Sequence, residues 1–267
     1  MQGARLSVAG AVAAALAVLL AACSSKPIDR TAGWSPNRIH AEAKDELNAG
    51  AYDKAIPLYE TLEGRAAGTT LAQQAQLDKA YALFKDGQKA EAIATLDRFM
   101  RLHPASPAID YALFLKGVIN FNDELGMLSF LARQDLSERD QKAAKEAFES
   151  FNELVTRFPD SRYAPDARAR MRYTINALAQ YEEHVARYYF TRGAYVAAIN
   201  RAQQALADYR DAPSLEEALY ILTQSYDRLG MTELRDDARR VLDRNYPNST
   251  YLTHGLRGAD KPWWQLW

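Results

Sequence analysis

The sequence predicts an all-α fold, an α-solenoid of about five helix pairs. Three observations predict it. After residue 36, apolar residues recur every three or four positions, which is the spacing of amphipathic helices. Helix-breaking residues fall between these periodic segments. The stretch GAYDKAI at 50–56 returns as GAYVAAI at 193–199, which indicates an internal repeat.

The composition is that of a globular chain without a charge excess. Of the 267 residues, 48% are hydrophobic and 25% are charged, and the formal net charge is −1. This balance excludes a disordered chain. Because a nucleic-acid-binding surface needs an excess of basic residues, we expect no nucleic-acid partner.

Residues 1–22 are predicted to form a signal peptide. One cation, Arg5, precedes an apolar run from Leu6 to Leu20, and small residues follow. The run is shorter than the ~20 residues that a spanning helix needs. We therefore interpret it as a cleaved leader; the alternative is a short membrane helix.

The leader ends in LAAC, which resembles the lipobox of bacterial lipoproteins. Cys23 is the only cysteine, so an intrachain disulfide is impossible. The resemblance implies that Cys23 is acylated and anchors the mature chain to a membrane. Ser24, which follows, implies export to the outer membrane. Residues 23–36 are polar and contain two prolines, so we interpret the segment after the cysteine as a flexible tether.

Residues 37–248 are predicted to hold five repeats of one helix–turn–helix unit. A glycine at the turn permits a positive φ, and a small residue five positions later lets the second helix approach the first. This pattern resembles the 34-residue tetratricopeptide repeat (TPR). The turn glycines are Gly50, Gly87, Gly193 and Gly230, and the small residues are Ala55, Ala92 and Ala198.

Three segments depart from a plain array of repeats. The third repeat contains an insertion at 123–139, and the fourth begins with an overlong helix at 164–192. The tail at 249–267 ends in DKPWWQLW and holds three of the four tryptophans. Tryptophan is enriched in binding hot spots and at membrane interfaces. The tail is therefore either a binding segment or an end that folds back onto the last pair.

The proline inside the first repeat is expected to be structural. We predict Asp53 as the N-cap of the second helix, which would place Pro57 in the first turn of that helix. The N–H groups of a first turn have no partner within the helix, so a proline there sacrifices little.

The sequence contains no recognisable arrangement of catalytic or metal-binding residues. None of the four histidines lies four residues from another, and neither a GxSxG nor a GxxxxGKS motif occurs. Some lipoprotein lytic transglycosylases carry a lysozyme-like domain behind helical repeats, but here we expect no such domain after residue 248. We expect no enzyme activity, no cofactor and no metal.

Several short motifs together resemble one family of lipoproteins. They are QQAQL at 73–77, DRF at 97–99, PxxDY at 107–111, RxDxSxRD at 133–140, YExxVAxYY at 181–189 and RGAYVA at 192–197. With the lipobox and the TPR array, they resemble the BamD family (also called ComL). Its members are lipoproteins of the outer-membrane β-barrel assembly (BAM) machinery. The resemblance covers residues 20–247.

The resemblance implies a non-enzymatic scaffold on the inner leaflet of the outer membrane, facing the periplasm. Its N-terminal repeats would receive unfolded outer-membrane proteins. Its C-terminal repeats would dock the periplasmic domain of the barrel subunit, BamA, and other BAM lipoproteins are further expected partners. The expected docking residues are Arg192, Tyr195, Asn200 and Arg201. The expected substrate groove contains Gln73, Gln74, Leu77, Tyr81 and Phe84.

Alternative interpretations stay open at this point. Without the family resemblance, Arg201 would be interpreted as a solvated helix residue. Tyr81 and Phe84 would be interpreted as residues that pack between helices. Many relatives have a Tyr-Pro-Phe-Gly turn where this chain has RAAGT at 65–69. The rival function is that of another TPR lipoprotein, such as a pilotin for secretin or pilus assembly. A peptidoglycan-associated protein is a further alternative.

Overall fold

The computed structural model describes residues 30–121, 141–210, 212 and 214–256. Every regular element in these ranges is a helix, and ten of the helices form five successive pairs, which confirms the predicted all-α solenoid. The pairs are α2 (Pro36–Asn48) with α3 (Tyr52–Arg65), α4 (Thr70–Lys85) with α5 (Lys89–Leu102), α6 (Ile109–Asn120) with α8 (Gln141–Arg157), α9 (Ala164–Thr191) with α10 (Tyr195–Asp208), and α11 (Glu216–Arg228) with α12 (Thr232–Asn245). A short helix, α13 (Thr250–His254), follows them.

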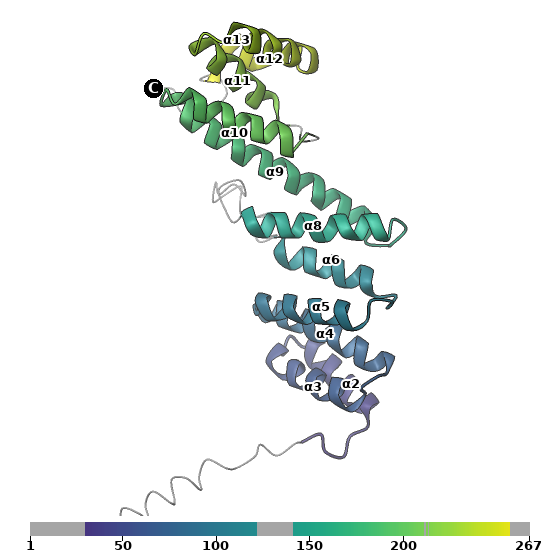
Figure 1. Ribbon diagram of the computed structural model, residues 1–267. Coiled ribbons are helices and arrows are strands. Elements are labelled where there is room, and N and C mark those ends of the chain that lie inside the picture. Colours follow the sequence, from purple (N-terminus) through teal and green to yellow (C-terminus); the bar gives the residue numbers. More distant parts are fainter. Residues whose placement is uncertain (1–29, 122–140, 211, 213, 257–267) are drawn as a thin grey trace, which may run out of the picture.

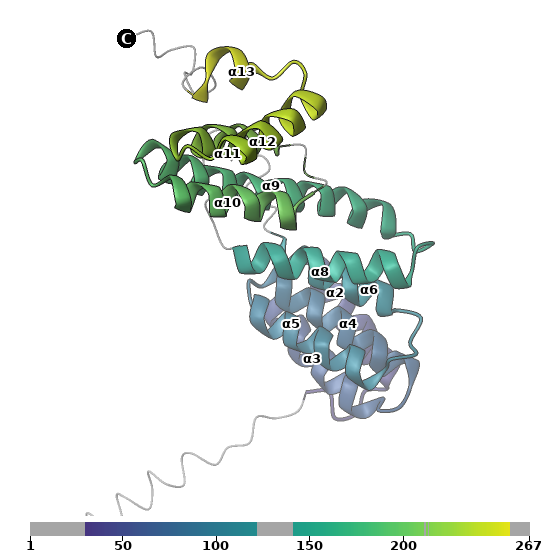
Figure 2. The same cartoon turned by 45° about the horizontal axis from the view of Figure 1, so that its top comes forward.

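The pairs stack in chain order into an elongated, curved array (Figure 1 and Figure 2). Each pair contacts the pairs before and after it, as in other solenoids. The long helix α9 packs against α8, α10 and α11, so it joins the third, fourth and fifth pairs. This is the overlong helix that the repeat spacing predicts.

The turn between the paired helices is built as the sequence predicts. The four turn glycines have φ between 70 and 82°, a region that residues with a Cβ rarely adopt. The small residues five positions later are fully buried where the two helices of a pair cross. These residues are Ala55, Ala92 and Ala198.

Three apolar clusters form the core. One joins α2, α3 and the start of α4, a second joins the helices from α4 to the start of α9, and a third joins the rest of α9 to α10, α11 and α12. Consecutive clusters share helices α4 and α9, so the core runs along the whole array. This continuity explains why no repeat stands alone.

The proline in the first repeat lies deeper in its helix than predicted. Helix α3 begins at Tyr52 with Ala51 as its N-cap, so Pro57 is the sixth helical residue and Asp53 lies in the first turn. The prediction of Asp53 as N-cap was wrong because the Gly50 turn ends at once: the N–H groups of Lys54 and Ala55 already bond to the carbonyl of Ala51. Pro57 therefore removes one helical hydrogen bond.

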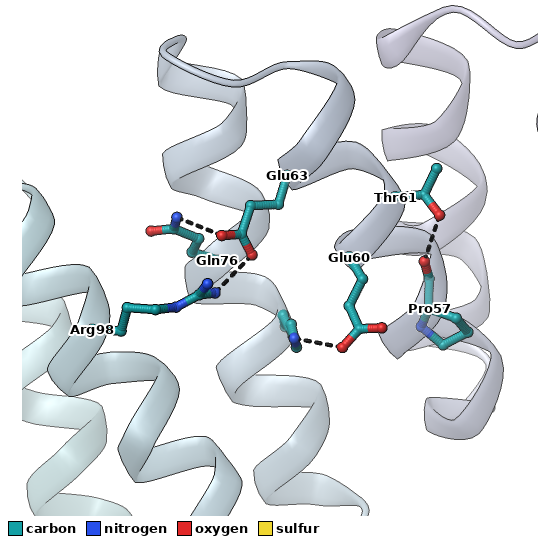
Figure 3. A network of polar contacts seen from close by, with 7 residues as sticks. Pro57, Glu60, Thr61, Glu63, Gln76 and Arg98 are labelled. Carbon is teal, nitrogen blue, oxygen red and sulfur yellow. Dashed lines mark hydrogen bonds and ion pairs between the residues drawn. The ribbon is translucent and has the colours of Figure 1, made fainter.

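Polar side chains on α3, α4 and α5 meet at one carboxylate (Figure 3). Glu63 accepts hydrogen bonds from Gln76 Nε2 at 2.9 Å and from Arg98 Nη2 at 2.9 Å. The first residue of the DRF motif, Asp97, pairs with Lys116 of α6 at 2.7 Å. The QQAQL and DRF motifs thus supply contacts that hold successive repeats in register.

The end of the expected tether packs against the first repeat. Arg65 Nη2 donates to the hydroxyl of Thr31 at 3.0 Å, and Arg65 Nη1 donates to the carbonyl of Trp34 at 3.3 Å. The guanidinium of Arg38 lies over the Trp34 ring, 4.4 Å from its centre. Residues 31–34 are therefore fixed on α3 and form part of the folded array.

Three segments named in the sequence analysis lie outside the described residues. They are Cys23 with the signal peptide, the insertion at 123–139, and the part of the tail from 257 onward. Among the described helices, none combines the length and the apolar character of a membrane span.

Candidate interaction surfaces

The first surface is a groove of about 480 Å³ between α4, the start of α6 and the start of α9. Apolar and aromatic side chains form part of its wall, and charged groups lie beside them. The lining residues are Gln74, Leu77, Asp78, Pro107, Ala108, Asp110, Tyr111, Arg162 and Tyr163.

The structure brings some of the predicted groove residues together and separates others. Gln74 and Leu77 line the groove. Gln73 lies near its edge, where its Oε1 accepts a hydrogen bond from Ser106 Oγ at 3.0 Å. Tyr81 and Phe84 are half-buried against the central core cluster and are not among the lining residues. Both aromatic side chains thus contribute to packing, and their part in binding stays a prediction.

The groove has an acidic side and one cation. Asp78 accepts a hydrogen bond from Gln74 Nε2 at 2.8 Å, and His40 Nε2 lies 3.5 Å from its carboxylate. Burial raises the pKa of Asp78 above its ordinary value, although the bond from Gln74 opposes this shift. Burial and the charge of Asp78 raise the pKa of Tyr111 to about 12. Arg162 is exposed, and its guanidinium lies over the Tyr163 ring, 4.7 Å from its centre.

Sequence reasoning did not assign Asp78, Arg162 and Tyr163 to this groove. Arg162 and Tyr163 belong to the loop before α9, and only the stacking of α6 on α4 brings that loop beside Gln74. A contact that fixes the loop is the bond from Ser161 Oγ to Asp110 Oδ2 at 2.6 Å. The PxxDY motif carried a usable signal, because three of its residues line the groove.

The second surface lies on α10 and the end of α9. Arg201 Nη1 donates to Glu182 Oε2 at 3.1 Å; the arginine side chain is 45% exposed and the glutamate side chain only 6%. Asn200 is exposed beside it. Val196, one helical turn earlier, is 61% exposed and was not assigned by the sequence analysis. Because residues four apart share a helix face, Val196 and Asn200 form one exposed strip.

The other two predicted docking residues lie at the turn between α9 and α10. The guanidinium of Arg192 lies over the Tyr188 ring, 4.3 Å from its centre. Tyr195 packs its ring edge-on against Phe190 at a centroid distance of 5.6 Å. Arg192 is exposed and Tyr195 is half-buried, so they border the strip formed by Val196 and Asn200.

A buried acidic cluster connects α9 to the fifth pair. Glu183 and Glu217 are both buried, and Arg187 pairs with both oxygens of Glu217. The Tyr251 hydroxyl of α13 also donates to Glu217, at 3.0 Å. Burial, and then the charge of Glu217, raise the pKa of Glu183 to about 8. Within the described residues, no group of histidine, cysteine, aspartate and glutamate side chains is arranged to hold a metal ion.

With both surfaces located, the chain can be compared with known proteins. The family model described as YfiO, outer membrane lipoprotein, matches residues 33–242. The chain belongs to this family. The YfiO region includes both candidate surfaces and all five helix pairs except the end of α12.

Curated relatives are similar along nearly the whole chain. Proteins from Neisseria meningitidis serogroup A and Neisseria gonorrhoeae are 48% and 47% identical, and each alignment covers 94% of this chain and 96% of the relative. A protein from Vibrio cholerae is 34% identical over 85% of this chain and 94% of its own length. All three are named outer membrane protein assembly factor BamD. The predicted resemblance to the BamD family is confirmed, and the YfiO description points to the outer membrane.

Proposed function

We propose that the chain is an outer membrane protein assembly factor that works as a scaffold of the BAM complex. The observation that carries this proposal is the similarity to proteins of that name, at 34–48% identity over 85–94% of the chain. A solenoid of TPR type is consistent with a scaffold, because such arrays act through extended binding surfaces. The proposed role needs no catalytic group.

The anchor of this scaffold is the acylated Cys23, which holds the chain on the inner leaflet so that the solenoid faces the periplasm. The lipobox sequence supports this part of the proposal. Two or more acyl chains bind a protein firmly to a bilayer. Labelling cells with a palmitate analogue should tag the wild-type chain and leave Cys23→Ser untagged. A tagged Cys23→Ser chain would contradict the anchor.

The strip on α10 is the proposed docking site for the periplasmic domain of BamA. Arg201 uses one of its N–H groups on Glu182 and is nearly half exposed, so other guanidinium donors face outward. A guanidinium held in place by a buried carboxylate is pre-oriented to pair with a carboxylate or carbonyl of a partner. Val196 and Asn200 supply the apolar and amide contacts next to it, while Arg192 and Tyr195 border the strip.

The groove between α4, α6 and α9 is the proposed site for unfolded outer-membrane proteins. Tyr111 and Tyr163 offer apolar surface for side chains of an extended segment, and Gln74 and Arg162 offer donors for its carbonyl groups. A photo-crosslinking residue at Gln74 should capture an unfolded barrel protein, whereas one at Val241 on α12 should not. Equal capture at both positions would count against this groove.

Affinity purification from solubilised outer membranes tests the function as a whole. The wild-type chain should recover BamA together with other BAM lipoproteins. Recovery of a secretin without BamA would support the rival role of a pilotin and overturn the proposal.

A further inference from the structure

The C-terminal half of α9 carries an aromatic face. Tyr181, His184, Val185 and Tyr188 are spaced three or four residues apart and border a hollow of about 720 Å³, with Arg187, Tyr189 and Thr191. The Tyr188 side chain is 52% exposed. Apolar hollows that contain exposed aromatic side chains are typical of binding sites. We call the side chains of α9 that border this hollow the aromatic face.

The last described residues of the chain lie beside this face. Arg187, which borders the hollow, and Tyr251 of α13 both bond to the carboxylate of Glu217. Both donate to the same oxygen, Oε2, so the start of α13 lies within two hydrogen bonds of the aromatic face. Leu256 packs against the third core cluster, to which Tyr189 and Phe190 of α9 also pack.

The turn after α13 lies close to α11. Helix α13 has only five residues and is capped at its end by Gly255, whose φ is 67°. The Cα region of Gly255 approaches the hydroxyl of Tyr220, 3.4 Å from where a Cβ would stand.

The residues that follow have the chemistry and the reach to cover the aromatic face. Residues 257–267 contain Trp263, Trp264 and Trp267. Trp263 lies seven residues after Leu256, which gives an extended reach of about 23 Å. The face itself spans about 15 Å of helix. Tryptophan rings stack well on tyrosine rings and on guanidinium groups, both of which the face offers.

We propose that the tryptophan segment, residues 257–267, binds the aromatic face of α9 in the same chain. A partner of similar aromatic character would compete with this segment for the same face. This inference is independent of the proposed function, because it concerns how the chain folds on itself.

Disulfide cross-linking in the full-length chain tests the proposal without removing any aromatic residue. Thr191→Cys is placed at the edge of the face and Gln265→Cys between the tail tryptophans. The matched control pairs Gln265→Cys with Val241→Cys, because Val241 is 44% exposed and borders a separate apolar hollow between α10 and α12. Variants that carry only one of the added cysteines still contain the native Cys23. They are controls that measure any disulfide formed with Cys23.

The expected result is a disulfide that forms at least tenfold faster at Thr191→Cys than at Val241→Cys. Equal rates, or a faster reaction at Val241→Cys, would overturn the proposal. The proposal would also be overturned if Thr191→Cys formed a disulfide faster with Leu128→Cys in the insertion, or with a second protein, than with Gln265→Cys. Another segment or protein would then occupy the aromatic face.

Tryptophan fluorescence provides a second measurement. In a Trp34→Phe background all remaining tryptophans belong to the tail. Acrylamide quenching should rise at least twofold when Tyr181→Ala and Tyr188→Ala are combined, and should stay unchanged when Leu234→Ala and Val241→Ala are combined on α12. If acrylamide already quenches the tail tryptophans of the Trp34→Phe chain as strongly as free tryptophan, the proposal is contradicted.

Discussion

The guanidinium of Arg201 on α10 donates to the buried carboxylate of Glu182 on α9, at 3.1 Å. This pair gives Arg201 two roles, since the same side chain holds the fourth helix hairpin together and presents donors to solvent. A variant at Arg201 is therefore expected to change both the stability of the fold and the proposed docking. The two effects have to be measured separately.

Removing the Arg201 side chain should destabilise the fold. Arg201→Ala leaves Glu182 buried without its cation, which costs several kcal/mol for fully buried pairs; because Arg201 is nearly half exposed, we expect a loss of about 1–2 kcal/mol. Urea denaturation measures it. Combining Arg201→Ala with Glu182→Gln should recover most of the lost free energy of unfolding. A double variant as unstable as the single one would show that the ion pair is not the cause.

Changes on the exposed strip should affect docking alone. Val196→Asp and Asn200→Arg lie on the solvent face of α10, so each should change the unfolding free energy by less than about 0.5 kcal/mol. Together they should reduce co-purification of BamA at least tenfold. Val241→Asp on α12 is the matched control and should leave co-purification intact. Undiminished recovery of BamA by the α10 variants would move the docking site elsewhere.

The contact between Gly117 and Phe151 should not tolerate even a methyl group. A Cβ on Gly117 of α6 would stand 2.4 Å from Cε1 of the fully buried Phe151 ring. We expect Gly117→Ala to cost about 1–3 kcal/mol, as overpacking usually does. Gly64→Ala in α3 is the control, because nothing lies within 4 Å of its Cβ position. That change should be neutral or stabilising, and equal melting temperatures for both variants would contradict the packing argument.

The buried Glu183 should make stability fall as pH rises. Its pKa is raised from an ordinary value near 4.5 to about 8, so between these values the folded chain holds a proton that the unfolded chain has lost. The contribution of this bound proton to stability is complete below the lower pKa and is lost as the pH rises above the higher pKa. Glu183→Gln should flatten this slope and stabilise the fold above pH 8 by at least ~1 kcal/mol. Melting curves from pH 5 to 9 measure it, and an unchanged slope would show that Glu183 does not titrate in this range.

The fold could be predicted because its determinants are local. Gly50, Gly193 and the alanines five positions after them follow from backbone sterics within one hairpin, so their spacing alone indicates the repeat. The position of Pro57 was missed by a few residues, since the end of a tight turn and an N-cap look alike in sequence.

The candidate surfaces were predictable only in part. Gln74 and Leu77 were found from the family motif, but Arg162 reaches the same groove through the stacking of three repeats. Likewise, no local pattern indicates that Glu182 faces Arg201, because the contact depends on how α9 and α10 cross. Tyr81 and Phe84 resemble binding residues in the sequence, whereas in the structure both are half-buried against the second core cluster.

Depletion of the chain from its host, followed by measurement of folded β-barrel proteins in the outer membrane, tests the central claim most directly. Heat-modifiable mobility on gels distinguishes folded from unfolded barrels. We predict a severalfold loss of folded barrels, restored by the wild-type chain but not by the combined Val196→Asp and Asn200→Arg variant. Unchanged barrel levels in depleted cells, with loss of a secretin alone, would contradict it.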